Sequence, residues 1–269
     1  MGTIQKMKPV RIYRGDFKYK YVPYGDGAKA IIRDATIKFS SPTGLNDPFD
    51  CAPRYTVSNL HDLFRKFPKA FHGTNLSPGK RISHKRRMEI LLGNTFGVPT
   101  AFQKSIDQRA SICSMTSNPV NPLMWAHYAQ NHTGVVLEFS NNAPSDTNNL
   151  DLIISHLMSF HVEYEKTRPC IDLCEQNIVH DLLVKSSEWK YEDEIRCLNV
   201  GASAGIYGYE RRLLTSVILG ARIGDHEDDI RRLVEETNLE YGTNVAVYKA
   251  ALSESEYKII IPEHINYST

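Results

Sequence analysis

Acidic and basic side chains alternate in one short stretch of the sequence, EWKYEDEIRC. Its Glu192, Glu194 and Arg196 stand two residues apart. Side chains with this spacing point to the same face of a β-strand, so a strand here would bring the three together. Two neighbouring carboxylates can orient a ribose hydroxyl, stabilise a developing cation or share one proton. The same alternation is also typical of a half-solvated strand that does no chemistry.

Hydroxyl and amide side chains gather in a second stretch, KFSSPTGLNDPFD. A strand predicted over residues 36–42 runs into Ser40 and Ser41, and an Asn-Asp-Pro turn begins at Asn46. Binding residues often lie on such loops, although these residues can equally serve only to cap a turn.

Aromatic residues mark a predicted helix at residues 122–131, PLMWAHYAQN. Trp125 and Tyr128 are three apart and therefore share one face of it. Such a pair usually packs in a core, but it can also stack on the flat ring of a ligand.

Charge gives only a local indication of a polyanionic partner. The net charge of +1 provides no general attraction to nucleic acid or membrane. The stretch at residues 79–88, GKRISHKRRM, is the local basic run, and it suits either a solvated face or nucleic-acid binding. Its basic residues are Lys80, Arg81, Lys85, Arg86 and Arg87.

Composition predicts a cytoplasmic protein with reduced thiols. The chain has 269 residues, of which 41% are hydrophobic and 23% charged, ordinary values for a globular protein. Its first residues lack the apolar core of a signal peptide, and no window approaches a membrane span. The cysteine count of five is odd, and Cys170 and Cys174 have no second ligand pair, so we expect neither disulfides nor a metal site.

Strand and helix patterns alternate irregularly, which favours a single α+β domain over residues 1–269. Residues 57–110 are predicted to form a mainly helical insertion or lobe. Residues 10–23 are predicted to form one strand or a hairpin. Further strands are predicted at 36–42, 110–116, 133–140, 160–166, 191–200 and 213–220, and helices at 25–35, 122–131, 174–189 and 225–238.

An ordered set of motifs resembles a widespread bacterial family known mainly as a domain of unknown function. The motifs are YKYVP (19–23), FSSP (39–42), NDPFD (46–50), SICSMT (111–116), MWAHYA (124–129) and K-x3-W-x2-E-x-E-I-R from Lys185 to Arg196. This resemblance spans about residues 19–220 and supplies no chemistry by itself.

The order of strand, helix ending in Ile-Ile, strand and late Glu-bearing strand is also similar to the ADP-ribosyltransferase superfamily. The likeness is nearest to toxins that modify nucleic-acid bases. It implies a mixed or antiparallel sheet split around a cleft for NAD, with Glu194 as the catalytic carboxylate and Glu192 as its helper.

The same resemblance implies which residues contact NAD. The first-strand residue is Lys20 or Tyr21, or else Arg14, and the second-strand residue is Ser40 or Ser41. The chain lacks a His-Gly or Arg-Gly pair in its YKY strand and a Ser-Thr-Ser on the second strand. Further contacts are expected from Asn46, Trp125, Tyr128 and Arg196.

The expected function is an NAD-dependent ADP-ribosyltransferase, a bacterial toxin or phage-defence effector that modifies RNA or DNA and has an antitoxin as a possible partner. One alternative is a non-catalytic nucleic-acid or protein binding module that uses residues 79–88 and the aromatic helix. The others are a transferase with a protein target, and a hydrolase that uses the Glu192 and Glu194 pair without NAD.

Overall fold

The structure is a computed structural model of the chain. It describes residues 8–59, 62, 65–66, 77, 79–80, 82–83, 86, 106, 108–142, 148–175 and 177–268. Most of the predicted helical insertion at 57–110 lies outside these residues, and so do Arg81, Lys85 and Arg87 of the basic run.

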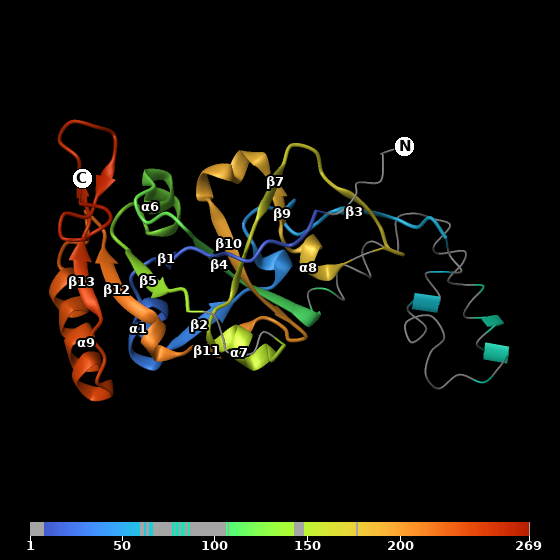
Figure 1. Cartoon of the computed structure of the whole chain (residues 1–269), viewed down its shortest axis with the longest axis horizontal. Helices are drawn as coiled ribbons and strands as arrows, with labels where there is room; N and C mark the ends of the chain where they lie inside the picture. Colours follow the sequence, from blue (N-terminus) through green and yellow to red (C-terminus); the bar gives the residue numbers. More distant parts are fainter. Residues whose placement is uncertain are drawn as a thin grey trace.

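The described strands build a seven-stranded mixed sheet in the order β13-β12-β5-β1-β4-β10-β6 (Figure 1). Neighbouring strands are antiparallel, except that β12 and β13 run parallel. The architecture is therefore the predicted α+β fold in one domain. The strands are β1 (Phe17–Val22), β4 (Ala110–Thr116), β5 (Val135–Ser140), β6 (Ser159–His161), β10 (Glu194–Val200), β12 (Leu214–Leu219) and β13 (Ala246–Lys249).

Shorter elements surround this sheet. The two-stranded sheets pair β2 (Thr36–Phe39) with β11 (Gly205–Gly208), β3 (Arg54–Thr56) with β8 (Cys170–Asp172), β7 (Glu163–Glu165) with β9 (Val184–Ser186), and β14 (Ala251–Leu252) with β15 (Ile259–Ile260). The helices are α1 (Asp26–Asp34), α6 (Pro122–Tyr128), α7 (Leu150–Ser155), α8 (Ile178–Asp181) and α9 (His226–Tyr241), with 3-10 turns η1 (Pro42–Gly44), η2 (Ser187–Glu192) and η3 (Arg211–Leu213).

The large sheet is split between its central strand β1 and the neighbouring β4, as predicted. β1 and β4 pair only at Tyr19 and Thr116, whereas β1 pairs with β5 over six residues and β4 with β10 over seven. Farther along β4, Ile112 instead exchanges backbone hydrogen bonds with Ser40, just after β2. The Lys20 ammonium spans the gap and donates to the Ser114 carbonyl at 2.9 Å. The opening between β1 and β4 positions the site described below.

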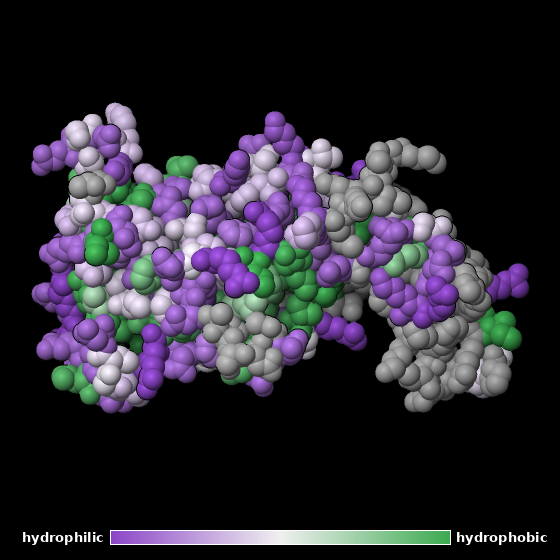
Figure 2. Space-filling view, viewed as in Figure 1, coloured by the Kyte–Doolittle hydropathy of each residue, from purple (hydrophilic) through white to green (hydrophobic). Residues whose placement is uncertain are grey.

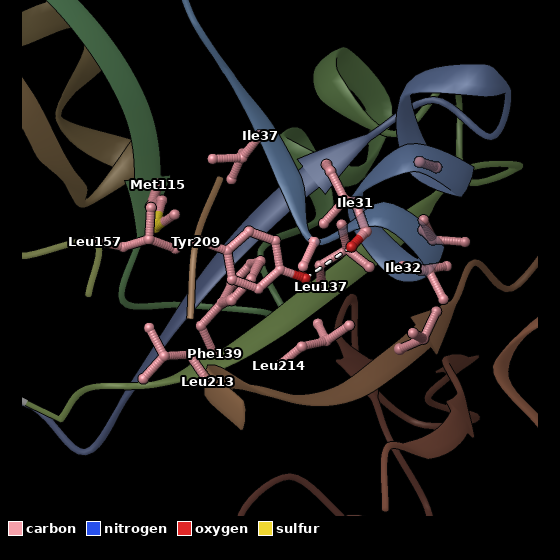
Figure 3. Packing of buried hydrophobic residues seen from close by; sticks show 14 of the residues in the cluster. Ile31, Ile32, Ile37, Met115, Leu137, Phe139, Leu157, Tyr209, Leu213 and Leu214 are labelled. Carbon is pink, nitrogen blue, oxygen red and sulfur yellow. Dashed lines mark hydrogen bonds between the residues drawn. The ribbon is translucent and has the colours of Figure 1, made fainter. Parts of the chain in front are cut away.

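Each face of the sheet has its own apolar core. On one face, α1 buries Ala28, Ile31 and Ile32, whose i, i+3, i+4 spacing makes a single apolar stripe. Figure 3 shows Tyr209 packed among these residues and the sheet, with its hydroxyl donating to the Ile31 carbonyl at 2.7 Å. On the other face, α6 packs Trp125 against Tyr19 and Tyr21 of β1.

The surface facing the viewer in Figure 2 is largely hydrophilic over the described residues, with smaller apolar groups between. No helix among the described residues has the length and apolar character needed to cross a bilayer. All five cysteines are described, and none of them forms a disulfide.

Candidate functional site

A cleft of about 230 Å³ occupies the opening between β1 and β4. Seven residues predicted to form a site line it together: Lys20, Tyr21, Ser40, Asn46, Tyr128, Glu192 and Glu194. They come from β1, the end of β2, the loop after η1, α6, η2 and β10, so the fold collects parts of the sequence that lie up to 174 residues apart (Glu194 minus Lys20). Lys38, Asp50, Ser114, Thr116 and Lys185 also line the cleft.

Glu192 and Glu194 reach the cleft by a route that the alternating pattern did not predict. Glu192 ends the 3-10 turn η2, Glu194 begins β10, and Asp193 between them adopts a left-handed conformation with φ 44°. The predicted strand over 191–200 therefore starts three residues late. Both faces of β10 are buried rather than one, because other elements cover the charged side chains.

The segment before η2 also differs from prediction. Residues 174–189 were expected to form one helix, but they contain α8, the strand β9 and the beginning of η2. Ser186 ends the strand and its hydroxyl accepts from the Glu188 backbone amide, which starts the 3-10 turn. This break directs Lys185, at the centre of β9, toward the two glutamates.

Five buried charged side chains meet at the base of the cleft. Lys185 forms ion pairs with Glu192, with Glu194 at 2.9 Å and with Asp50 at 3.6 Å. Arg196 binds Glu194 through two hydrogen bonds of 2.8 and 2.9 Å and binds Asp50 at 2.6 Å. No side chain in this cluster is more than 4% exposed. Three carboxylates and two cations thus hold one another in a fixed arrangement.

This cluster shifts the pKa values of Glu194 and Glu192 in opposite directions. Burial alone disfavours an ionised Glu194, but the guanidinium of Arg196 and the ammonium of Lys185 outweigh it and hold its pKa at about 2. Glu192 is likewise buried, and it has no arginine partner, so burial prevails over Lys185 and Tyr128 and its pKa is raised. Paired acids with separated pKa values are typical of acid–base sites.

Glu192 is also the end of a hydrogen-bond chain from the cleft wall. The Tyr128 hydroxyl donates to Glu192 Oε1 at 2.5 Å, and the Asn46 side-chain amide donates to the Tyr128 oxygen at 2.9 Å. Burial first, and then the adjacent Glu192 carboxylate, raise the pKa of Tyr128, so its phenol stays protonated.

The NDPFD turn forms one wall of the cleft and is tied to it at three points. Asn46 donates to Tyr128, Asp47 accepts from the Trp189 indole at 2.7 Å, and Asp50 binds Arg196. Asp50 was not among the predicted site residues. Its position in the same motif as Asn46 was the only indication in the sequence that it could belong to the site. Nothing in the sequence indicates that it pairs with Arg196.

The lining of the cleft also contains basic residues. Lys20 and Lys38 both line the cleft, and Lys38, on β2, is exposed. Neither takes part in an ion pair with any described carboxylate, and the Lys20 ammonium contacts the Ser114 carbonyl. Lys38 was not predicted, because alternation along β2 shows that it is exposed but not that it faces a cleft.

Three residues predicted to contact NAD do not line the cleft. Trp125 is fully buried, packs edge-on against Tyr21 and donates from its indole to the Pro119 carbonyl at 2.8 Å. Arg196 lies behind Glu194 with no exposed surface, so it holds the carboxylate rather than a ligand. Ser41, the residue before η1, is not among the lining residues. Arg14, the alternative first-strand residue, precedes β1 and is also absent from the cleft lining.

The described residues contain no group of three or more His, Cys, Asp or Glu side chains arranged to hold a metal ion. The ionisable groups that line the cleft are its carboxylates, lysines and tyrosine phenols. A cleft lined by a fixed anion, a protonated phenol and two lysines suits a ligand with both an anionic part and a centre that becomes cationic.

Comparison with known protein families gives one match, over part of the chain. A family model described as a protein of unknown function (DUF2971) matches residues 124–197. The match includes the MWAHYA motif and the stretch from Lys185 to Arg196, whereas the YKYVP, FSSP and NDPFD motifs precede it. No curated protein and no solved structure matches the chain.

Proposed function

We propose that the chain is an ADP-ribosyltransferase that uses NAD as its substrate. The observation that carries this proposal is the charge arrangement within the split of the sheet. Glu194 is held ionised on one side of the cleft, and Lys20 and Lys38 line it without carboxylate partners. The split sheet and the late carboxylate strand are also what the superfamily resemblance implied.

Glu194 would act at the ribose. Breaking the bond between nicotinamide and ribose leaves positive charge on the sugar, while the bond's electron pair leaves with nicotinamide as a neutral base. A fixed carboxylate can hydrogen-bond the ribose hydroxyl and stabilise that charge. Both Glu194 oxygens are already held by Arg196, so the carboxylate would need no reorganisation as the charge develops.

Lys20 and Lys38 would hold the phosphates. The cleft volume of about 230 Å³ is smaller than the roughly 300–1,000 Å³ typical of sites that enclose a drug-sized ligand. It suits the nicotinamide riboside end of NAD, with the pyrophosphate near the exposed Lys38 at the rim. Lysines bind phosphate as point charges and need no bidentate geometry.

The burial of the cluster supports a functional role over a purely structural one. Replacing a buried ion pair by packed apolar residues is often neutral or stabilising, by about 1–4 kcal/mol. The arrangement of Lys185, Arg196 and three carboxylates is therefore a poor choice for stability alone. Strongly shifted ionisable groups beside a cleft are typical of functional sites.

The direct test is release of nicotinamide from NAD, with mass spectrometry of any ADP-ribose adduct. Glu194→Gln should raise the activation barrier by about 3–4 kcal/mol, which lowers the rate a hundredfold or more. Glu188→Gln is the matched control, because it makes the same chemical change at an exposed position of η2. Absence of nicotinamide release by the wild type, or equal rates for both variants, would reject the proposal.

Lys38→Ala provides a second test that does not disturb the buried cluster. Lys38 is exposed, so its removal should leave the fold intact and raise the KM for NAD while kcat changes little. A normal KM for NAD would place the phosphates elsewhere.

The superfamily resemblance further suggests a toxin or phage-defence effector with a nucleic-acid acceptor. RNA, DNA and protein extracts incubated separately with labelled NAD would identify the class of acceptor. Label in protein alone would reject the nucleic-acid acceptor but not the transferase.

A further inference from the structure

We propose that Tyr128 is a catalytic proton carrier, which takes the proton of the acceptor and passes its own proton to Glu192. The inference rests on the proposed transferase function and assigns the second half of the reaction. It follows from the chain that joins Asn46, Tyr128 and Glu192 at the wall of the cleft.

The direction of this chain is fixed by its two ends. An amide N–H of Asn46 can only donate, and an ionised Glu192 can only accept, so the Tyr128 hydrogen points to the carboxylate. A phenol oxygen both donates and accepts. In the structure the exposed Asn46 amide occupies the acceptor side, and an N–H or O–H group that enters the cleft takes the place of that amide on the Tyr128 oxygen.

The remaining contacts of Glu192 keep it ready to receive a proton. Its second oxygen is paired with Lys185, which also binds Glu194. The raised pKa of Glu192 makes it a better base than Glu194, whose pKa is about 2. The two glutamates would thus divide the work: Glu194 stabilises charge on the ribose, and Glu192 collects the proton.

The bonds and charges balance in this scheme. The acceptor's N or O forms a bond to the ribose carbon as the bond to nicotinamide breaks, and nicotinamide leaves neutral with the electron pair. The acceptor's proton moves to the Tyr128 oxygen as the Tyr128 proton moves to Glu192. Tyr128 ends as a neutral phenol and Glu192 as a neutral acid, which then releases the proton to water.

The relay defines the chemistry of the acceptor. It serves a neutral group that carries a hydrogen and must lose it on attack, such as a hydroxyl, a water molecule or a lactam N–H. It is of no use to an acceptor that attacks through a bare lone pair. This difference permits a test without knowledge of the natural acceptor.

Two reactions of the purified full chain with NAD separate the roles. Hydrolysis uses water, which must lose a proton, whereas exchange of nicotinamide for 3-acetylpyridine uses a ring nitrogen that has none. Tyr128→Phe and Glu192→Gln should each slow hydrolysis by about a hundredfold and change the exchange rate by less than about threefold. Glu194→Gln should slow both reactions.

Tyr191→Phe is the matched control, because it removes a phenol oxygen that contacts His127 rather than Glu192 and leaves both reactions unchanged. Equal loss of hydrolysis and exchange in Tyr128→Phe, or loss of neither, would overturn the relay while leaving the transferase in place. A wild-type protein that performs neither reaction would instead reject the proposed function itself.

Discussion

Arg196 binds both carboxylate oxygens of Glu194, from Nε to Oε1 at 2.8 Å and from Nη2 to Oε2 at 2.9 Å, with no exposed surface on the guanidinium. The same guanidinium donates to Asp50 and to the Leu182 carbonyl. One side chain therefore fixes the proposed catalytic carboxylate, a second acid and the backbone that precedes β9.

Replacing Arg196 should destabilise the protein severely. Arg196→Met leaves Glu194 and Asp50 buried with only Lys185 as a cation, and breaking a buried pair costs about 3–5 kcal/mol. Urea unfolding measures the effect. Arg231→Met is the matched control, since the Arg231 pair with Glu227 on α9 is partly exposed and is worth at most about 1 kcal/mol. Similar losses for both variants would contradict the structure.

Glu194 and Glu192 should shift stability in opposite directions with pH. The folded-state pKa of Glu194 is about 2, below its ordinary 4.5, so its contribution is present above about pH 4.5 and is lost as the pH falls toward 2. The pKa of Glu192 is raised, so its contribution is present at low pH and is lost as the pH rises through the raised value.

Unfolding free energies measured from pH 2 to 7 check this pair. The advantage of wild type over Glu194→Gln should grow as the pH rises from 2 to about 5, whereas its advantage over Glu192→Gln should shrink as the pH rises. Parallel slopes for the two variants would show that the ion pair of Glu194 with Arg196 does not distinguish the acids.

NAD should stabilise the folded protein under the proposed function. A ligand at a hundred times its Kd adds about 2.7 kcal/mol to the free energy of unfolding. We expect a rise in Tm with NAD for the wild type, and a smaller rise for Lys38→Ala at the same NAD concentration. An identical rise in both proteins would show that Lys38 does not contact the ligand.

A side chain at Gly220 should be poorly tolerated. A Cβ there would lie 2.1 Å from the His132 carbonyl oxygen and 2.9 Å from that of Gly134, both of them backbone atoms. Gly220→Ala should therefore cost at least about 2 kcal/mol in unfolding free energy. Gly25→Ala is the control, because a Cβ at Gly25 meets nothing within 4 Å and its φ of 166° is ordinary extended backbone.

Much of the fold could be predicted because local patterns agreed with it. The strands at 110–116 and 133–140 and the helix at 25–35 have strong β-branched or amphipathic signals, and each was found within two residues of its predicted bounds. The prediction of one helix over 174–189 was wrong because the apolar spacing suits a helix as well as a buried strand. The ion pairs of Lys185 with distant carboxylates favour the strand at that residue.

The site was predictable in outline only. Chain order placed Glu194, Lys20 and Ser40 around one cleft, and the structure brings them together. Asp50 and Lys38 were missed, since their roles depend on which distant elements they face. The prediction that Trp125 contacts a ligand is wrong, because the sequence does not distinguish an aromatic residue that packs in the core from one that stacks on a ligand.

The single ladder pair between Tyr19 and Thr116 has a mechanical consequence. Separating β1 from β5 would break six residue pairs at once, and separating β4 from β10 would break seven. Between β1 and β4 the ladder contributes one residue pair, and side-chain hydrogen bonds add to it, including Lys20 with the Ser114 carbonyl, Tyr21 with the Asn118 carbonyl and Tyr128 of α6 with Glu192. Side chains rather than a backbone ladder thus set the width of the cleft, so a substitution at one of them can alter that width while the ladders on either side stay paired.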